Sequence, residues 1–170
     1  MGNDADVLID MQWVEQHLED PTVRVVEVDE DVGLYSRGHI PGAIGLDWRR
    51  DLQARASCDF LGPERFGELL GAHGISNEHR IVLYGDRDNW FAATTFWYLK
   101  YYGHDDVWLL EHDRDGWIAA GKPLSAEPPA YDPQRFTARP GDADFSAAYD
   151  DGSHSGWGSF GDAVLDPAEV

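Results

Sequence analysis

The chain has 170 residues, of which 42% are hydrophobic and 12% aromatic, enough for one domain with a packed core and unlike the composition of a disordered chain. Its formal net charge is −19, and Lys100 and Lys122 are its only lysines. This balance disfavours nucleic-acid binding, because phosphate contacts need clustered lysine and arginine. Membrane association is not expected either, because no apolar run is long enough to cross a bilayer.

The acidic charge is spread over the whole chain, in a pattern that resembles proteins of salt-loving archaea and implies a halophilic source. Mutual repulsion of these charges loosens a compact state in dilute buffer and is screened in molar salt. An acidic face that docks a basic partner is the alternative interpretation. Cys58 is the only cysteine, so no disulfide forms within the chain. Residues 1–6 show no secretory signal, and we therefore expect a cytoplasmic protein.

The first half of the chain predicts two strands and a helix. Asp10 is a suitable N-cap for a helix that runs to Glu19. The β-branched run Val23–Val28 predicts a strand. A connection that contains the letters GHIPGAIG follows at Tyr35–Gly45, and it leads into a short strand near Ala43–Leu46.

The second half alternates helices and strands more regularly. Pro63 is a favourable first residue for a helix to His73 that Gly74 closes. The further predicted elements are a strand at Ile81–Tyr84, a helix at Trp90–Tyr102, a strand at Val107–Leu110 and a short helix at Arg114–Ala120. Strands that alternate with helices predict an α/β fold with a central parallel sheet and helices on both faces. Ligands of such sheets lie beyond the carboxyl ends of the strands.

The composition changes after about Glu127. Four prolines open a segment that is rich in glycine, aspartate, serine and alanine and has no sustained period. We therefore expect a domain at residues 1–127 and an acidic linker or tail at residues 128–170.

The turn after the strand Ile81–Tyr84 is the strongest candidate site. A strand that leads through a tight turn into a helix N-terminus makes a pocket for anions, because unpaired backbone N–H groups converge there. This layout resembles the active-site loop of the rhodanese sulfurtransferases, in which a cysteine begins the turn and carries sulfur as a persulfide. Gly85 takes the place of that cysteine, and Trp90 lies near the place of a family arginine. The degenerate loop positions are Gly85, Asp86, Arg87, Asp88, Asn89 and Trp90.

A second motif strengthens the resemblance. Val23–Gln53 resembles the start of the first domain of tandem thiosulfate sulfurtransferases, with the signature formed by Gly38, His39, Ile40, Pro41, Gly42 and Ala43. The resemblance covers residues 7–127 and implies a rhodanese-like three-layer fold. In tandem enzymes the first domain is generally non-catalytic, and the second carries the persulfide cysteine. The chain departs from the family pattern at His112 and Asp113, where two glycines are usual.

Other candidate residues have structural interpretations. We expect Asp86 to cap the helix that follows it and the His39 ring to hold its turn by hydrogen bonds. Cys58 lies in a loop-like run without the strand–turn–helix setting that lowers a thiol pKa, which makes it a weak thiol candidate. Neither the histidines nor the Asp86–Asn89 run has metal-ligand spacing, so we expect no metal and no cofactor.

The resemblance therefore implies a rhodanese-like domain without its persulfide cysteine, inactive alone, that acts as a scaffold or as a regulatory or partner-binding half. The partner would be a catalytic sulfurtransferase domain or a second copy of the chain, and the aromatic helix at Trp90–Tyr102 could supply the contact face. The alternative is an active thiosulfate:cyanide sulfurtransferase that uses Cys58 or a partner's cysteine. A phosphatase relative is disfavoured, because that chemistry also needs a cysteine and an arginine around the loop.

Overall fold

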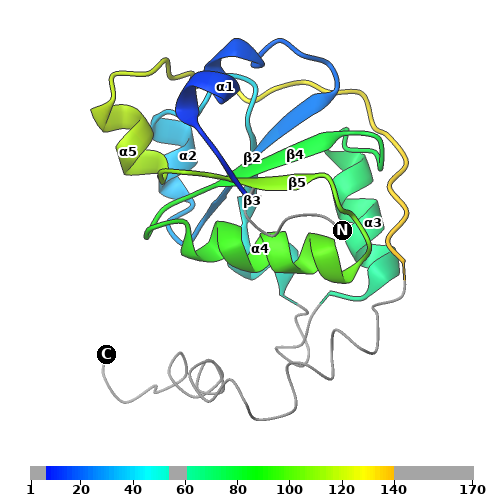
Figure 1. Ribbon diagram of the computed structural model, residues 1–170. Helices are drawn as coiled ribbons and strands as arrows, with labels where there is room; N and C mark the ends of the chain where they lie inside the picture. The colour runs from blue at the N-terminus through cyan, green and yellow to red at the C-terminus, as the bar shows by residue number, and fades with distance from the viewer. Residues whose placement is uncertain (1–6, 54–60, 140–170) are drawn as a thin grey trace, which may run out of the picture. The chain divides into compact units, whose positions relative to one another are not determined.

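The computed structural model describes residues 7–53 and 61–139. Within these ranges one sheet of five parallel strands has the order β1-β5-β4-β2-β3 (Figure 1). The strands are β1 (Leu8–Ile9), β2 (Val23–Asp29), β3 (Ile44–Asp47), β4 (Arg80–Tyr84) and β5 (Val107–Leu110). The central strands β4 and β2 therefore end side by side.

Helices cover both faces of this sheet. They are α1 (Met11–Gln16), α2 (Gly33–Arg37), α3 (Pro63–Ala72), α4 (Trp90–Tyr101) and α5 (Arg114–Ala119), with a π-helical turn at Trp48–Leu52. One core packs α3 and α4 against the sheet, and a second core packs α1 and α5 against its other face. The predicted α/β fold with a parallel sheet between two helical layers is confirmed.

The alternation of side chains along β2 explains why both cores form. Val26 and Val28 belong to the core under α3 and α4, whereas Val23 and Val25 belong to the core under α1 and α5. Successive side chains of a strand point to opposite faces, so a strand covered on both sides is apolar throughout. Glu27 interrupts this pattern and lies on the face that α5 covers, where it reaches the candidate site.

The strands and longer helices begin and end close to their predicted limits. Asp10 caps α1 by accepting a hydrogen bond from the Trp13 N–H at 2.7 Å, although α1 ends at Gln16 rather than Glu19. Sequence reasoning missed β1, α2 and the π-helical turn. Each has five residues or fewer, too short for a hydrophobic period to be recognised.

Residues 128–139, which fall in the predicted linker or tail, run along the side of the domain (Figure 1). Phe136 is buried in the core beneath α3 and α4, and the Gln134 N–H donates to the Gly71 carbonyl. The compact unit that contains the sheet extends to residue 140. The change of character expected near residue 127 stays a prediction.

Among the described residues, no helix has the length and apolar character needed to span a bilayer.

Candidate functional site

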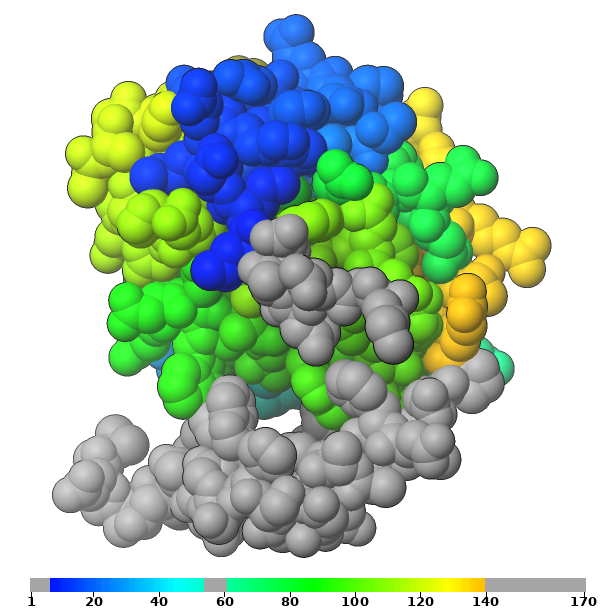
Figure 2. Space-filling view, in the orientation of Figure 1, coloured from blue at the N-terminus to red at the C-terminus, as the bar shows by residue number. Residues whose placement is uncertain are grey.

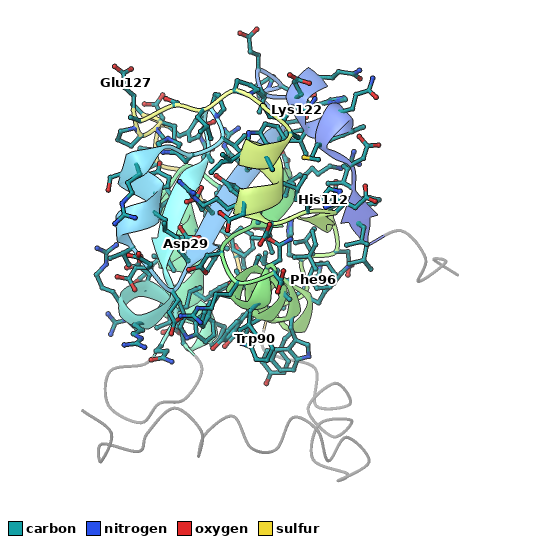
Figure 3. All side chains as sticks on the ribbon, turned by 90° about the vertical axis from the view of Figure 1, so that its left-hand side faces the viewer. Asp29, Trp90, Phe96, His112, Lys122 and Glu127 are labelled. Atoms are coloured by element: carbon teal, nitrogen blue, oxygen red, sulfur yellow. The ribbon has the colours of Figure 1, made fainter. Side chains whose placement is uncertain are left out.

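The candidate site lies at the carboxyl end of the sheet, where β2, β4 and β5 lead into their loops. Figure 3 views the molecule from this side and labels Asp29 at the end of β2, Trp90 at the start of α4 and His112 after β5. The loop Gly85–Asn89 connects β4 to α4 at this edge. The predicted strand–turn–helix arrangement is therefore present.

Gly85 lies so close to β2 that it has no room for a side chain. A Cβ at this position would overlap the Val28 carbonyl oxygen and lie 3.0 Å from the Val28 carbonyl carbon. Both atoms belong to the backbone of a central strand and cannot move aside as a flexible side chain can. The place that a cysteine takes in the resembling loops is therefore sterically closed here.

The loop backbone is left-handed over three successive residues. Arg87, Asp88 and Asn89 have φ angles of 50°, 55° and 61°. Asn89 tolerates this conformation because its short amide can bond locally. Its Oδ1 accepts from the Gly85 N–H at 2.9 Å, and its Nδ2 donates to the Leu110 carbonyl at 2.9 Å. The Asn89 side chain thus ties the loop to itself and to β5.

The N–H groups that an anion would use are bonded to oxygens of the chain itself. The Asp86 N–H donates to Asp29 Oδ1 at 2.9 Å, and the Asp88 N–H donates to Asp113 Oδ2 at 3.2 Å. The Trp90 N–H donates to the Arg87 carbonyl at 3.2 Å. The carboxyl groups of Asp29 and Asp113 therefore take the positions in which an anionic ligand would lie. Sequence reasoning singled out Asp113 only as a departure from the family pattern, and it missed Asp29.

Asp113 stands where the resemblance implies glycine, and its conformation needs none. Its φ of −74° is ordinary, and its Oδ1 caps α5 by accepting from the Gly116 N–H at 2.9 Å. The Asp113 carboxylate thus bonds through Oδ1 to the first turn of α5 and through Oδ2 to the Gly85–Asn89 loop. This departure from the family pattern helps to close the loop.

The expected role of Asp86 as a cap of α4 is wrong. Its carboxylate instead accepts from the Glu30 N–H at 3.1 Å and from the Asp31 N–H at 3.2 Å, both in the loop after β2. Its own N–H donates to Asp29. Asp86 is thus bonded through both its backbone and its side chain to the end of β2 and the loop after it, and α4 has no side-chain cap bond at its first turn.

Asp29 is 3% exposed, and burial raises its pKa to about 9, with hydrogen bonding to Glu27 and the charges of Glu27 and Asp86 as further causes. The carboxyl group is therefore protonated at neutral pH, which limits repulsion among three neighbouring acidic side chains.

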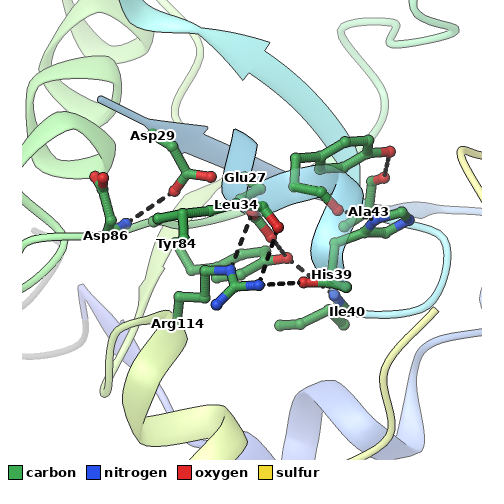
Figure 4. A network of polar contacts seen from close by, with 12 residues as sticks. Glu27, Asp29, Leu34, His39, Ile40, Ala43, Tyr84, Asp86 and Arg114 are labelled. Carbon is green, nitrogen blue, oxygen red and sulfur yellow. Dashed lines mark hydrogen bonds and ion pairs between the residues drawn. The ribbon is translucent and has the colours of Figure 1, made fainter. Parts of the chain in front are cut away.

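A buried polar network lies behind the loop (Figure 4). Tyr84 pairs with Glu27 across β4 and β2, donates its hydroxyl proton to the Glu27 carboxylate and accepts from the Ile40 N–H at 2.9 Å. Arg114 Nε lies 3.5 Å from Glu27 Oε1, and both side chains are almost fully buried. Burial, followed by the Glu27 charge, raises the pKa of Tyr84 well above its usual value, so the phenol stays neutral.

This network also holds the GHIPGA turn. Arg114 Nη2 donates to the Gly38 carbonyl at 2.6 Å and to the Leu34 carbonyl at 3.0 Å. The His39 ring is fully buried and stacks on Tyr35, with Nδ1 2.9 Å from the Tyr35 carbonyl and Nε2 3.0 Å from the Glu127 carbonyl. These contacts support the structural interpretation of His39. Ile40 and Ala43 of this turn lie in the core under α1 and α5, whereas Pro41 and Gly42 are partly exposed.

Of the remaining candidates, Arg87 is exposed and pairs with Glu30 at 2.5 Å, and Trp90 begins α4 with 48% of its surface exposed. Cys58 lies outside the described residues. Within residues 7–53 and 61–139, no group of three or more histidine, aspartate or glutamate side chains could hold a metal ion. The described part of the site therefore offers carboxylates and a neutral phenol, and neither a thiol nor room for one.

A family model described as the rhodanese-like domain matches residues 10–120. The chain is 48% identical over 146 residues to a protein of Thermus thermophilus named sulfur carrier protein TtuD. It is 45% identical over 151 residues to a putative thiosulfate sulfurtransferase of Haloferax volcanii. Each alignment covers 86% of this chain, but 51% and 53% of the relative. The chain thus spans about half the length of the curated relatives it matches.

Solved structures agree on the fold. The 3-mercaptopyruvate sulfurtransferase SseA of Escherichia coli superposes with a TM-score of 0.72 at 20% identity, over 81% of this chain and 58% of the other. A structure named YnjE gives a TM-score of 0.61 at 27% identity and covers 79% of this chain and 33% of its own.

Proposed function

Because the chain belongs to the rhodanese-like domain family, we propose that it is a non-catalytic member that acts as a scaffold or regulatory half beside a cysteine-bearing sulfurtransferase domain. One observation carries the proposal. Gly85 replaces the family cysteine at a position where a Cβ would overlap the Val28 carbonyl oxygen. The attacking thiolate of sulfur transfer thus has no place at the start of this loop.

The bonds of the loop support the same conclusion. A persulfide or thiosulfate sulfur needs free N–H donors at the helix N-terminus. Asp29 and Asp113 occupy two of these donors. A ligand anion would have to displace both side chains and would meet Asp86 and Asp88 nearby.

The lengths of the relatives support a partner domain. Proteins 45–48% identical to this chain are about twice as long as the matched region. We propose that the partner of this chain is such a second, cysteine-bearing domain, or a second copy of the chain. Size measurement of the purified chain, alone and with the second half of the Haloferax relative, tests this, and a monomer in both samples would contradict it.

The activity is tested by cyanide-dependent formation of thiocyanate from thiosulfate. We expect the purified chain to show no turnover above buffer, with the full-length Thermus relative assayed in parallel. Robust turnover by the purified chain would overturn the proposal.

The relatives' sulfurtransferase names favour one alternative, in which the chain is active through Cys58 or through a partner's cysteine. Cys58→Ser separates the two routes. Turnover that Cys58→Ser abolishes assigns the thiol to Cys58, whereas turnover that appears only with the partner domain and survives Cys58→Ser assigns it to the partner.

A further inference from the structure

Residues 131–139 form an extended segment, which we call the strap, along the outer side of α3. In Figure 1 it descends in yellow and orange beside this helix, and in Figure 2 the same colours lie along one edge of the molecular surface. The strap contains no helix or strand, so its position depends on contacts with the domain. Those contacts are of three kinds.

The first kind is close backbone packing against glycines of α3. A Cβ at Gly67 would lie 2.6 Å from the Phe136 carbonyl oxygen, and one at Gly71 would lie 2.5 Å from the Gln134 carbonyl oxygen. These glycines are one helical turn apart on the same face. The Gln134 N–H donates to the Gly71 carbonyl at 2.8 Å. The face of α3 is thus shaped to admit the strap backbone.

The second kind is hydrogen bonding at the end of the strap. Asn77 Nδ2 donates to the Thr137 carbonyl at 2.9 Å, and Asn77 Oδ1 accepts from the Thr137 N–H at 2.8 Å. The Arg139 N–H donates to the Tyr102 carbonyl at 3.0 Å. The Asn77 side chain therefore bonds to both backbone groups of Thr137, as the backbone of a neighbouring strand would.

The third kind is the burial of Phe136 against His104. Phe136 is 6% exposed, His104 is 3% exposed, and their ring centroids are 5.5 Å apart. His104 Nε2 is buried without a hydrogen-bond partner. Burial lowers the pKa of His104 and outweighs the causes that raise it, which are hydrogen bonds with the backbone of Asp106 and His79 and the charges of Asp106 and Asp105. A proton on this ring would therefore be a buried charge beside the Phe136 ring.

The other charged groups near His104 do not remove this penalty. Asp105 and Asp106 follow it in the chain and are exposed to solvent. Lys100 of α4 donates to the Asp105 carbonyl at 2.7 Å, and the side chain of Arg139 lies against Gly103. His79, in the turn before β4, accepts from the Ser76 N–H through Nδ1 at 2.8 Å. The strap and α4 thus add cations to the surroundings of His104.

We propose that the strap is a proton-sensitive latch, which is closed while His104 is neutral and opens when His104 takes up a proton. Opening moves Phe136 away and lets water solvate the imidazolium. Release frees the nine strap residues from the side of α3, and together they form a tether that reaches up to about 30 Å, at about 3.3 Å per extended residue. This consequence rests on the proposed function: a partner domain held through that end could lie farther from the sheet when the latch is open.

The test is hydrogen–deuterium exchange of the full chain between pH 7.5 and pH 5, corrected for the intrinsic exchange rate. We expect protection of the Thr137 and Arg139 amides to fall below pH 6.5, by up to about tenfold per pH unit, while β4 amides stay protected. In His104→Phe, which keeps an aromatic ring and cannot be protonated, strap protection should be independent of pH. The control change His17→Phe, at the C-cap of α1 and far along the chain, should leave the response intact.

Three results would overturn the latch. The first is that, in the wild-type chain, protection of the strap amides does not fall relative to that of the β4 amides at low pH. This measurement needs no variant, so it decides the question even if His104→Phe fails to fold. Another is loss of protection in the strap and β4 together, which would mean global unfolding. The third is a response that persists in His104→Phe and disappears in His79→Gln, which would assign the proton to His79.

Discussion

The replacement of Gly85 by alanine or cysteine is the sharpest test of the closed loop. The new Cβ would lie 3.0 Å from the Val28 carbonyl carbon and closer still to its oxygen, whereas ordinary contact begins at 3.4 Å. β2 and the end of β4 must then separate by on the order of 1 Å to restore normal packing. β2 is paired with β3 and β4 on its two sides, so it cannot yield freely.

Strain of this kind in a packed interior typically costs about 1–3 kcal/mol. The separation also stretches the bond from the Asp86 N–H to Asp29. We expect Gly85→Ala to lower the melting temperature by about 4–12 °C, at about 4 °C per kcal/mol for a domain of this size. Gly62→Ala is the matched control, because no atom lies within 4 Å of a Cβ at Gly62.

Thermal unfolding followed by circular dichroism measures both variants, and the thiocyanate assay is then applied to Gly85→Cys. We expect Gly85→Cys to be destabilised like the alanine variant and to show no turnover, because Asp29 and Asp113 still occupy the loop N–H groups. A Gly85→Ala protein as stable as Gly62→Ala, or thiocyanate formation by Gly85→Cys, would refute the steric argument.

Three further predictions concern charge. Asp29 has a pKa raised to about 9, so the native state binds a proton that the unfolded chain releases near pH 4, and stability falls as pH rises between these values. In urea unfolding, the free energy of unfolding of the wild type should fall relative to that of Asp29→Asn between pH 5 and pH 8.5, by at most about 1.4 kcal/mol per pH unit. A difference between the two proteins that does not change with pH would count against a protonated Asp29. Arg114→Met leaves Glu27 buried without its ion-pair partner and should lower the free energy of unfolding in urea by about 3–5 kcal/mol. The control Arg49→Met, which removes an exposed ion pair, should lower it by less than about 1 kcal/mol. Equal losses in the two variants would contradict the role of the buried network. Because the chain carries a net charge of −19, salt should weaken the repulsion among its acidic side chains. The melting temperature should therefore rise between 0.1 M and 2 M sodium chloride, as the Debye length falls below about 3 Å. A melting temperature that does not depend on salt would argue against the proposed halophilic adaptation.

The fold could be predicted because its signals are local. Pro63 and Gly74 mark the limits of α3, and Asp10 caps α1 as expected. The missed π-helical turn left a local signal too, since Asp47 accepts from the N–H groups of both Arg49 and Arg50. β1 left none, because its two residues are a strand only through pairing with β5.

The site was less predictable because its decisive contacts join residues far apart in the chain. Sequence reasoning placed Gly85 at the start of the loop, but Val28, which closes that position, lies on another strand. Asp86 was assigned to the nearest helix, which is the usual choice for an aspartate before a helix. Its actual donors, Glu30 and Asp31, are more than fifty residues earlier and are brought near by the pairing of β2 with β4.

These long-range contacts change what the missing cysteine means. If Gly85 were an isolated substitution in an open loop, one mutation back to cysteine would restore a nucleophile. Here such a mutation meets the Val28 carbonyl, and the N–H groups that would stabilise the thiolate are bonded to Asp29 and Asp113. A working site would require β2 to move and the carboxyl groups of both Asp29 and Asp113 to leave the loop N–H groups. The proposed inactivity therefore rests on the folded loop and its neighbours, and Asp29 and Asp113 should be considered together with Gly85 when catalytic members of the family are distinguished from non-catalytic ones.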